Sequence, residues 1–170
     1  KRTCLAMKHI ISLLLENEAG SLSRVSGLFS ARAFNIESLS VAPTEDPTMS
    51  RLTLVTTGSD AIVEQITKQL NKLVDVIKVV DLNEYEHIER ELLLIKLVAE
   101  VKEDHDAIKH IVDTFYGRIV NVNDNLYTIE ITDTCEKIDA FIITLDDRLI
   151  LEVVRSGASA ISLSDKAIQS

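Results

Sequence analysis

A short segment near the N-terminus combines residue types that could hold a small charged molecule: Leu15-Glu16-Asn17-Glu18-Ala19-Gly20-Ser21-Leu22-Ser23-Arg24. An apolar run ends here and a helical pattern begins. Backbone N–H groups at a helix start have no intrahelical acceptor and lie at the positive end of the helix dipole, so they can hold a carboxylate. Gly20 has no Cβ and lets a ligand approach the backbone, while Asn17 has both a donor and an acceptor. The segment therefore suits a small zwitterion, and the chain has the character of a sensor for a small acid.

The same segment also fits a plain turn followed by a helix cap, because Asn, Gly and Ser are common at such positions for backbone reasons alone. The second half of the chain offers an internal comparison. Its corresponding segment, Ala99-Glu100-Val101-Lys102-Glu103-Asp104-His105, has neither the glycine nor the asparagine. This difference favours a ligand site in the first half only.

Six elements in the first half must position this segment. Apolar residues predict a strand over 9–15, and the helical spacing of residues 22, 25, 28 and 29 predicts a helix after it. Two strands, 35–42 and 51–57, are joined by a polar loop over 43–50 that contains both prolines. A second helix opens at 58–60, and a strand over 74–82 follows it. The expected apolar face of that helix is Ile62, Ile66, Leu70 and Leu73.

The same order of elements recurs after a charged stretch. Residues 92–99 predict a strand and 104–116 a helix, with Gly117 where a C-cap belongs. Strands over 118–122 and 126–132 flank a turn, and a helix over 135–145 precedes a strand over 149–154. The tail from Arg155 onward is polar and small.

The expected fold is therefore α+β, with two tandem ferredoxin-like βαββαβ sandwiches that each place both helices on one face of an antiparallel sheet. The boundaries that follow are an N-terminal extension over 1–7, a first domain over 8–82, a linker over 83–91, a second domain over 92–164 and a tail over 165–170. A bare sheet face or edge is an association site, so we expect a homodimer.

The composition excludes several classes of protein. With 46% hydrophobic and 26% charged residues the chain resembles an ordinary globular protein, and a net charge of −9 argues against binding to nucleic acid. Cys4 and Cys135 form neither a disulfide framework nor a zinc pattern, which favours a reducing cytoplasmic location. No apolar run is long enough to span a bilayer, so no membrane partner is expected.

The sequence contains no set of catalytic residues. The four histidines do not have metal-ligand spacing, and no phosphate-binding glycine loop, nucleophile elbow or HExxH motif is present. Neighbouring acids such as Glu16 with Glu18 are best read as solvated surface. An RNA-recognition fold shares the βαββαβ order but needs aromatic residues on its central strands, and residues 51–56 have none. We therefore predict neither a catalytic nor a metal-binding residue.

Three runs of residues resemble a known family. They are residues 15–24 above, then Phe34-Asn35-Ile36-Glu37-Ser38-Leu39 followed by Val41-Ala42-Pro43-Thr44, and Leu73-Val74-Asp75-Val76. In this order they resemble the small regulatory subunit of acetolactate synthase, whose first half is an ACT domain. The resemblance extends from Met7 to about Lys166.

The resemblance implies that the chain is not an enzyme by itself. It would activate a large catalytic subunit and confer feedback inhibition by valine in the biosynthesis of branched-chain amino acids, including valine and isoleucine. Thiamine diphosphate, Mg²⁺ and FAD are expected on that catalytic partner, and no cofactor is expected in this chain. The sequence leaves open which branched-chain amino acid binds best, the stoichiometry, the role of the second domain and a metal at a subunit interface.

The family's valine site lies between two ACT domains. Its pattern maps onto Asn17, Ala19, Gly20, Ser21 and Leu22 of one chain, and the partner chain would supply the rest of the site. Full burial of the isopropyl group against aliphatic side chains would contribute about 1.5–3 kcal/mol. The partner's contribution maps onto Asn35 and Ile36.

The polar loop admits two interpretations. It is either a plain hairpin connection or a surface that contacts the catalytic subunit, since long loops on rigid scaffolds often carry recognition. The residues expected in that contact are Pro43, Thr44, Glu45, Asp46 and Pro47. A rival interpretation of the whole chain is a stand-alone ACT-type sensor that regulates another enzyme or a transcription factor.

Overall fold

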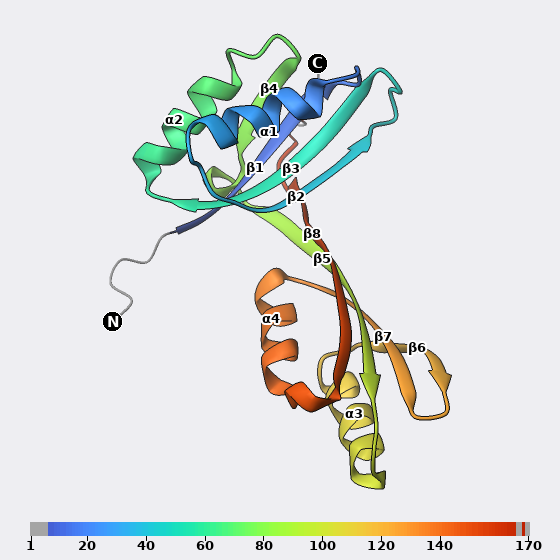
Figure 1. Cartoon of the computed structure of the whole chain (residues 1–170). Helices are drawn as coiled ribbons and strands as arrows, with labels where there is room; N and C mark the ends of the chain where they lie inside the picture. Colours follow the sequence, from blue (N-terminus) through green and yellow to red (C-terminus); the bar gives the residue numbers. More distant parts are fainter. Residues whose placement is uncertain (1–6, 166–167, 169–170) are drawn as a thin grey trace. The chain divides into compact units, whose positions relative to one another are not determined.

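The computed structural model describes residues 7–165 and 168, and the elements of its first half follow the expected order (Figure 1). Most of the expected N-terminal extension and most of the expected tail lie outside these residues. The elements of the first half are β1 (Met7–Glu16), α1 (Ser21–Ala31), β2 (Ile36–Pro43), β3 (Met49–Gly58), α2 (Asp60–Leu70) and β4 (Val76–Asp81).

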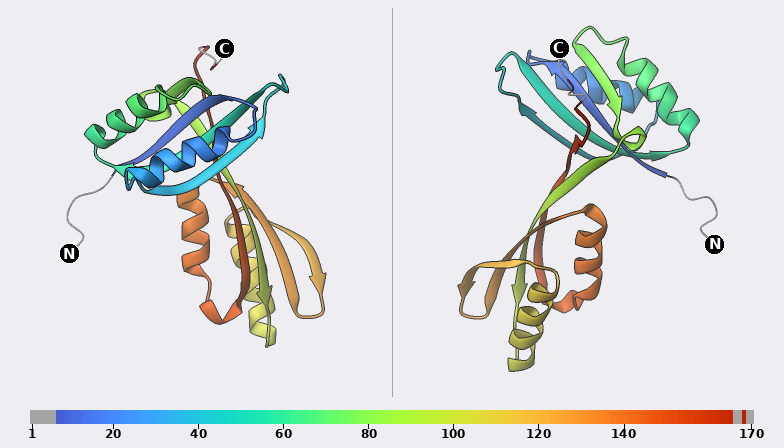
Figure 2. Two further views of the ribbon diagram at one scale, coloured as in Figure 1. Left: turned by 45° about the horizontal axis from the view of Figure 1, so that its top comes forward. Right: turned by 180° about the vertical axis from the view of Figure 1, so that it is seen from behind.

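The first sheet has the strand order β2-β3-β1-β4, and its neighbouring strands are antiparallel. Side chains alternate between the two faces of a strand, so Ile11 and Leu13 of β1 share one face with their partners Leu54 and Leu52 of β3. Both helices pack on that face (Figure 2). The helical contribution to this core is Val25 and Phe29 from α1 and Val63, Ile66 and Leu70 from α2.

The second half repeats the plan with the order β6-β7-β5-β8. A short 3₁₀ turn, Leu82–Glu84, leads into it, and another, Asp147–Leu149, precedes its last strand. Side chains of β5 and β7 form the core with α3 and α4, as in the first half. The elements are β5 (His87–Val98), α3 (Lys102–Thr114), β6 (Arg118–Asn123), β7 (Leu126–Asp133), α4 (Cys135–Thr144) and β8 (Ile150–Ser162).

The structure confirms two βαββαβ sandwiches and corrects several details. Strand β5 starts at His87, so part of the segment expected to be a linker is strand, and β8 continues through residues expected in a polar tail. The buried residue in the first turn of α2 is Val63, with 4% exposure, whereas Ile62 is 41% exposed. Strand β2 ends one residue later than expected and β3 begins two residues earlier, so only residues 44–48 connect them.

Gly117 serves packing rather than a left-handed helix cap. The residue with positive φ after α3 is Tyr116, at 54°. A Cβ on Gly117 would lie 2.9 Å from Cγ1 of Ile131 and 3.3 Å from Val112, so the close approach of strand and helix requires a glycine here. The expectation that Gly117 forms the cap is wrong, because the C-cap is Phe115 and the left-handed residue after it is Tyr116.

The described chain divides into two compact units. One contains the residues up to Ile88 together with those from Ser159 onward, and the other is Glu89–Ala158. The end of β8 therefore belongs to the first unit. No helix in the described ranges has the length and apolarity needed to cross a bilayer.

The start of α3 in the second unit is held by an ion pair. The buried Asp104 carboxylate accepts hydrogen bonds from the Arg148 guanidinium, at 2.5 Å and 3.1 Å, and from the N–H groups of Glu100 and Val101. The hydrogen bonds from Arg148 hold the pKa of Asp104 well below its usual range, although burial opposes this. A carboxyl whose pKa is lower in the folded state stabilises the fold above its unfolded pKa, and this contribution disappears as the pH falls.

We predict that Asp104→Asn lowers the melting temperature at pH 7. The difference from the unaltered protein should narrow as the pH falls below about 4, the pKa of an unfolded aspartate, because the wild-type carboxylate then loses its advantage. Thermal unfolding followed by circular dichroism across this pH range checks the prediction. Asp106→Asn, at an exposed position of the same helix, is the control and should change little. Equal effects of the two substitutions would contradict the assigned role of Asp104.

Candidate functional site

The junction between β1 and α1 leaves the helix start open. Gly20 precedes the helix with φ 89° and ψ −8°, a left-handed conformation that favours glycine. The Ser21 N–H donates to the Glu18 carbonyl at 3.2 Å, and the Arg24 N–H donates to the Gly20 carbonyl at 2.9 Å. The amides of Leu22 and Ser23 remain without an intrahelical acceptor.

The other α-helices of the described chain place their own polar or acidic side chains at the helix start. The hydroxyl groups of Ser59 and Thr134 accept backbone N–H groups at the starts of α2 and α4, and Asp104 lies in the first turn of α3. Each of these helices also has an acidic residue in its first turn. Helix α1 has neither a side-chain cap nor an acidic residue there, so the positive end of its dipole is available to an external anion.

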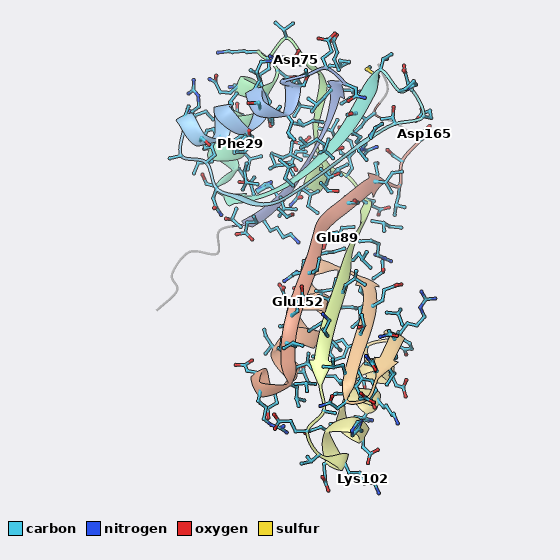
Figure 3. All side chains as sticks on the ribbon, turned by 45° about the vertical axis from the view of Figure 1, so that its right-hand side comes forward. Phe29, Asp75, Glu89, Lys102, Glu152 and Asp165 are labelled. Carbon is cyan, nitrogen blue, oxygen red and sulfur yellow. The ribbon has the colours of Figure 1, made fainter. Side chains whose placement is uncertain are left out.

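A guanidinium group lies beside the open helix start. Arg24 Nε donates to Oδ2 of the buried Asp75, which follows α2 at the start of the β4 segment (Figure 3). The hydrogen bond to Asp75 raises the pKa of Arg24. A Cβ on Gly20 would lie 3.0 Å from Arg24 Nη1, so the cation is adjacent to the glycine. Arg24 and Asp75 both occur in the runs quoted for the family, but their spacing in the sequence does not indicate that they form an ion pair.

Three carboxylates lie close together at this junction, and one of them is Asp75 of the ion pair. One oxygen each of Glu16, Glu18 and Asp75 lie within 4.8 Å of one another. Such a group could hold a cation. Arg24 already supplies a positive charge to Asp75, so the charge at this cluster is partly balanced without a metal ion.

Asn17 joins the junction to the loop between β2 and β3. Its backbone N–H donates to the Thr48 carbonyl at 2.7 Å, and its side-chain Nδ2 donates to the Pro47 carbonyl at 2.9 Å. One of the two N–H groups of Nδ2, which were expected to face a ligand, is therefore used within the chain. The Oδ1 acceptor and the second N–H group have no partner among the described residues.

The loop over residues 44–48 is held in a compact turn. Asp46 Oδ1 accepts the Thr48 N–H at 2.9 Å and the Thr48 hydroxyl at 2.7 Å, and these hydrogen bonds lower the pKa of Asp46. The Thr44 N–H donates to the Met49 carbonyl at 2.9 Å. The structure thus places two separately expected regions, the helix start and the loop, in direct contact through Asn17.

Asn35 and Ile36 do not join these residues within one chain. They follow the far end of α1, whose 11 residues extend over about 16 Å. Ile36 packs partly against the core of its own unit, and Asn35 Nδ2 donates to Thr57 Oγ1 at 3.4 Å. A site that contains both groups therefore needs a second copy of the chain.

The remaining expected residues differ in accessibility. Ala19 is exposed and Leu22 is 42% exposed, so both can meet a ligand at the surface. Ser21 is only 4% exposed, and its hydroxyl has no hydrogen-bond partner within the described ranges. This hydroxyl lies on the helix start itself and is free to accept or donate.

Comparisons with known proteins agree across both halves of the chain. A family model described as an AHAS small subunit-like ACT domain matches residues 11–78, and one described as the small subunit of acetolactate synthase matches residues 90–164. The chain is 55% identical to the acetolactate synthase small subunit of Haemophilus influenzae, with 95% of this chain and 99% of that protein covered. It is 48% identical to the isozyme 3 small subunit of Escherichia coli, with 96% and 100% covered.

A solved structure shows the same similarity in three dimensions. The crystal structure of the acetolactate synthase small subunit from Thermotoga maritima matches with a TM-score of 0.84 at 37% identity. The match covers 94% of this chain and 99% of that chain. The similarity therefore includes both βαββαβ units.

We predict that Asn17→Ala loosens the loop over residues 44–48. Loss of one hydrogen bond of about 0.5–1.5 kcal/mol should accelerate amide hydrogen exchange at Thr48 and Met49 by about 2- to 10-fold. Exchange followed by NMR checks this. Asn35→Ala makes the same chemical change beyond the far end of α1 and should leave the loop unaffected. Unaltered exchange in Asn17→Ala would show that the backbone bonds alone hold the loop.

Proposed function

Because the chain belongs to the family of acetolactate synthase small subunits, we propose that it binds valine at the start of α1 and so regulates a catalytic large subunit. As a member of this family it is a regulatory, non-catalytic subunit. In the proposal, the condensation of 2-oxo acids, the thiamine diphosphate, the Mg²⁺ and the FAD all belong to the large subunit.

The observation that carries the ligand proposal is the uncapped start of α1. The carboxylate of valine would accept hydrogen bonds from the amides of Leu22 and Ser23, at the positive end of the helix. The Arg24 guanidinium would add favourable charge beside Gly20. Nothing in the first turn of α1 competes for this position, since the turn contains no acidic residue.

The other two parts of valine have matching groups. Asn17 Oδ1 would accept a hydrogen bond from the ammonium group, which can only donate, while one N–H group of Nδ2 is held by Pro47. The exposed side chain of Leu22 offers apolar contact for the isopropyl group. Polar groups would thus fix the orientation of the ligand, and apolar contact would select its side chain.

A homodimer completes the proposed site. Asn35 and Ile36 lie beyond the opposite end of α1, so they would reach the ligand from a second copy. An interface of this kind makes ligand binding and subunit association interdependent, because each protomer contributes to the same site.

Asn17 gives the proposed site a route to the catalytic subunit. The loop that Asn17 contacts is the surface proposed to meet the large subunit. If valine weakens that association, the large subunit must weaken valine binding by the same factor, and a coupling of about 1–3 kcal/mol suffices for a useful response. Calorimetric titration of valine, leucine and isoleucine into the protein, alone and with the large subunit, tests both the ligand and the reciprocity.

We predict that Gly20→Asp yields an activator that valine does not inhibit. The new carboxylate would occupy the place of the ligand's carboxylate and repel it, so valine affinity should fall at the α1 start by at least about tenfold. Calorimetry and inhibition of the reconstituted enzyme measure the effect.

Gly20→Asn is the matched control, because the asparagine side chain has the same shape as that of aspartate, tolerates a positive φ and carries no charge. It should retain more affinity than Gly20→Asp. Normal valine inhibition of the Gly20→Asp enzyme would refute the proposed location of the carboxylate.

We predict that exchange of Thr44 and Glu45 for Gly-Ser abolishes activation of the large subunit. Asp46, Pro47 and Thr48 are kept, so that the hydrogen bonds of Asp46 to Thr48 and both contacts with Asn17 survive and valine affinity at the α1 start stays within about twofold. Activity assays with the large subunit and valine titrations measure the two effects separately. Full activation by this variant would remove the loop from the proposed interface.

A further inference from the structure

The helix-free face of the first sheet contains a pocket of about 770 Å³. Its floor comes from β1, β2 and β3, one wall is the loop between β2 and β3, and the other wall is the chain from Ser159 onward. All these residues belong to the first unit. The pocket contains none of the residues assigned to the α1 site, and its volume is in the range of small-molecule sites.

The end of the chain is fixed on this face. The Leu163 N–H donates to the Glu86 carbonyl at 2.8 Å, and the Ala160 carbonyl accepts from Arg51 Nη2 at 3.2 Å. Ser12 and Leu14 of β1 point away from the helices and are nevertheless buried, with at most 5% exposure. The helix-free face, expected to be bare, is thus partly covered by the chain itself.

Arg51 is the charged group at the floor of the pocket. It is partly buried, and its Nε donates to the Ser12 hydroxyl at 2.9 Å. With its bond to Ala160 this uses two of its donor nitrogens, whereas Nη1 has no partner among the described residues. Burial lowers the pKa of Arg51, and both of its hydrogen-bond acceptors, the Ser12 hydroxyl and the Ala160 carbonyl, are uncharged.

Three other arginines of this protein have carboxylate partners, unlike Arg51. Arg24, Arg148 and Arg155 each form an ion pair with a buried carboxylate. Arg51 has no carboxylate within ion-pair distance in the part of the chain that the structure describes. A partly buried guanidinium without an anion, facing a pocket, can donate hydrogen bonds to the carboxylate of a ligand.

Opposite charge lies at the mouth of the pocket. Glu45 and Asp165, both exposed, line it together with Asp46, and Asp165 lies beside the β2–β3 connection (Figure 3). One oxygen of Asp46 is already bonded to Thr48. Acidic groups near the entrance disfavour a plain anion but complement an ammonium group. Cation at the floor and carboxylates at the mouth together match a zwitterion.

We propose that this pocket is a second binding site for a small α-amino acid, separate from the start of α1. The ligand's carboxylate binds the free donors of Arg51, and its ammonium group faces Glu45 and Asp165. Leu14 and Met49 offer apolar contact to its side chain. Occupation would connect the loop over 44–48 to the end of β8, because both line the same pocket.

The test uses full-length protein with Gly20→Asp, in which the α1 site is blocked. Glycine, valine and glutamate are titrated to about 10 mM, and NMR records the amides of Thr44, Thr53 and Ala160. At least one of these amino acids should bind and shift all three signals. Arg51→Met in the same background should lower the affinity by at least about tenfold, whereas Arg51→Lys, which keeps the charge, should lower it less.

Fragments of the ligand test the zwitterion requirement. If valine is bound, isobutyrate, which lacks the ammonium group, and isobutylamine, which lacks the carboxylate, should each bind at least about tenfold more weakly. If the three amides do not shift in the Gly20→Asp protein, the proposal is overturned before any substitution of Arg51 is needed. It is also overturned if Arg51→Met in the Gly20→Asp background binds the amino acid as tightly as Gly20→Asp alone.

The outcome is distinguishable from failure of the α1 site. If the α1 site is wrong, Gly20→Asp and the unaltered protein bind valine identically, and any signal changes lie around the Arg51 pocket. If the Arg51 pocket is wrong, Gly20→Asp removes all binding. If both proposals hold, the unaltered protein binds at the α1 start and at the Arg51 pocket, and Gly20→Asp loses binding at the α1 start only.

Discussion

The amides of Leu22 and Ser23, in the first turn of α1, need a hydrogen-bond acceptor, and the described residues do not supply one within the helix. Gly20 has no side chain to cap the helix, and its left-handed conformation turns the backbone directly from β1 into α1. An anion or water must therefore meet Leu22 and Ser23. The Arg24–Asp75 ion pair joins this helix to the segment before β4. Helix α1 and β4 also pack against the core of the first unit, so the same elements that form the core position the open helix start.

The second unit has the same topology but not the same site. Its helix start contains Asp104, which binds the N–H groups of Glu100 and Val101 and the guanidinium of Arg148. The carboxylate of Asp104 thus balances the positive end of α3. One fold repeated in a single chain carries a helix start without an acidic residue in one copy and a helix start with Asp104 in the other, so the two copies differ in a few residues at one junction.

Hydrogen bonds and a shared loop connect the junction between β1 and α1 to the pocket over Arg51. Asn17 binds the loop between β2 and β3, and that loop forms one wall of the pocket over Arg51. The other wall is the end of β8, which hydrogen-bonds to Arg51 through Ala160. Ligands at either place would therefore act on the same short loop, whose turn is held by Asp46.

The sequence by itself determined what depends on local pattern: two βαββαβ units, an open helix start at Gly20 and the family, which the runs around Asn17, Asn35 and Asp75 already indicated. Only the tertiary structure decided the pairing of Arg24 with Asp75, the use of Asn17 Nδ2 by Pro47, and the return of β8 to the first unit. These contacts join residues that are 30 to 109 positions apart, and their geometry follows from strand order and packing, which periodicity and propensity do not encode.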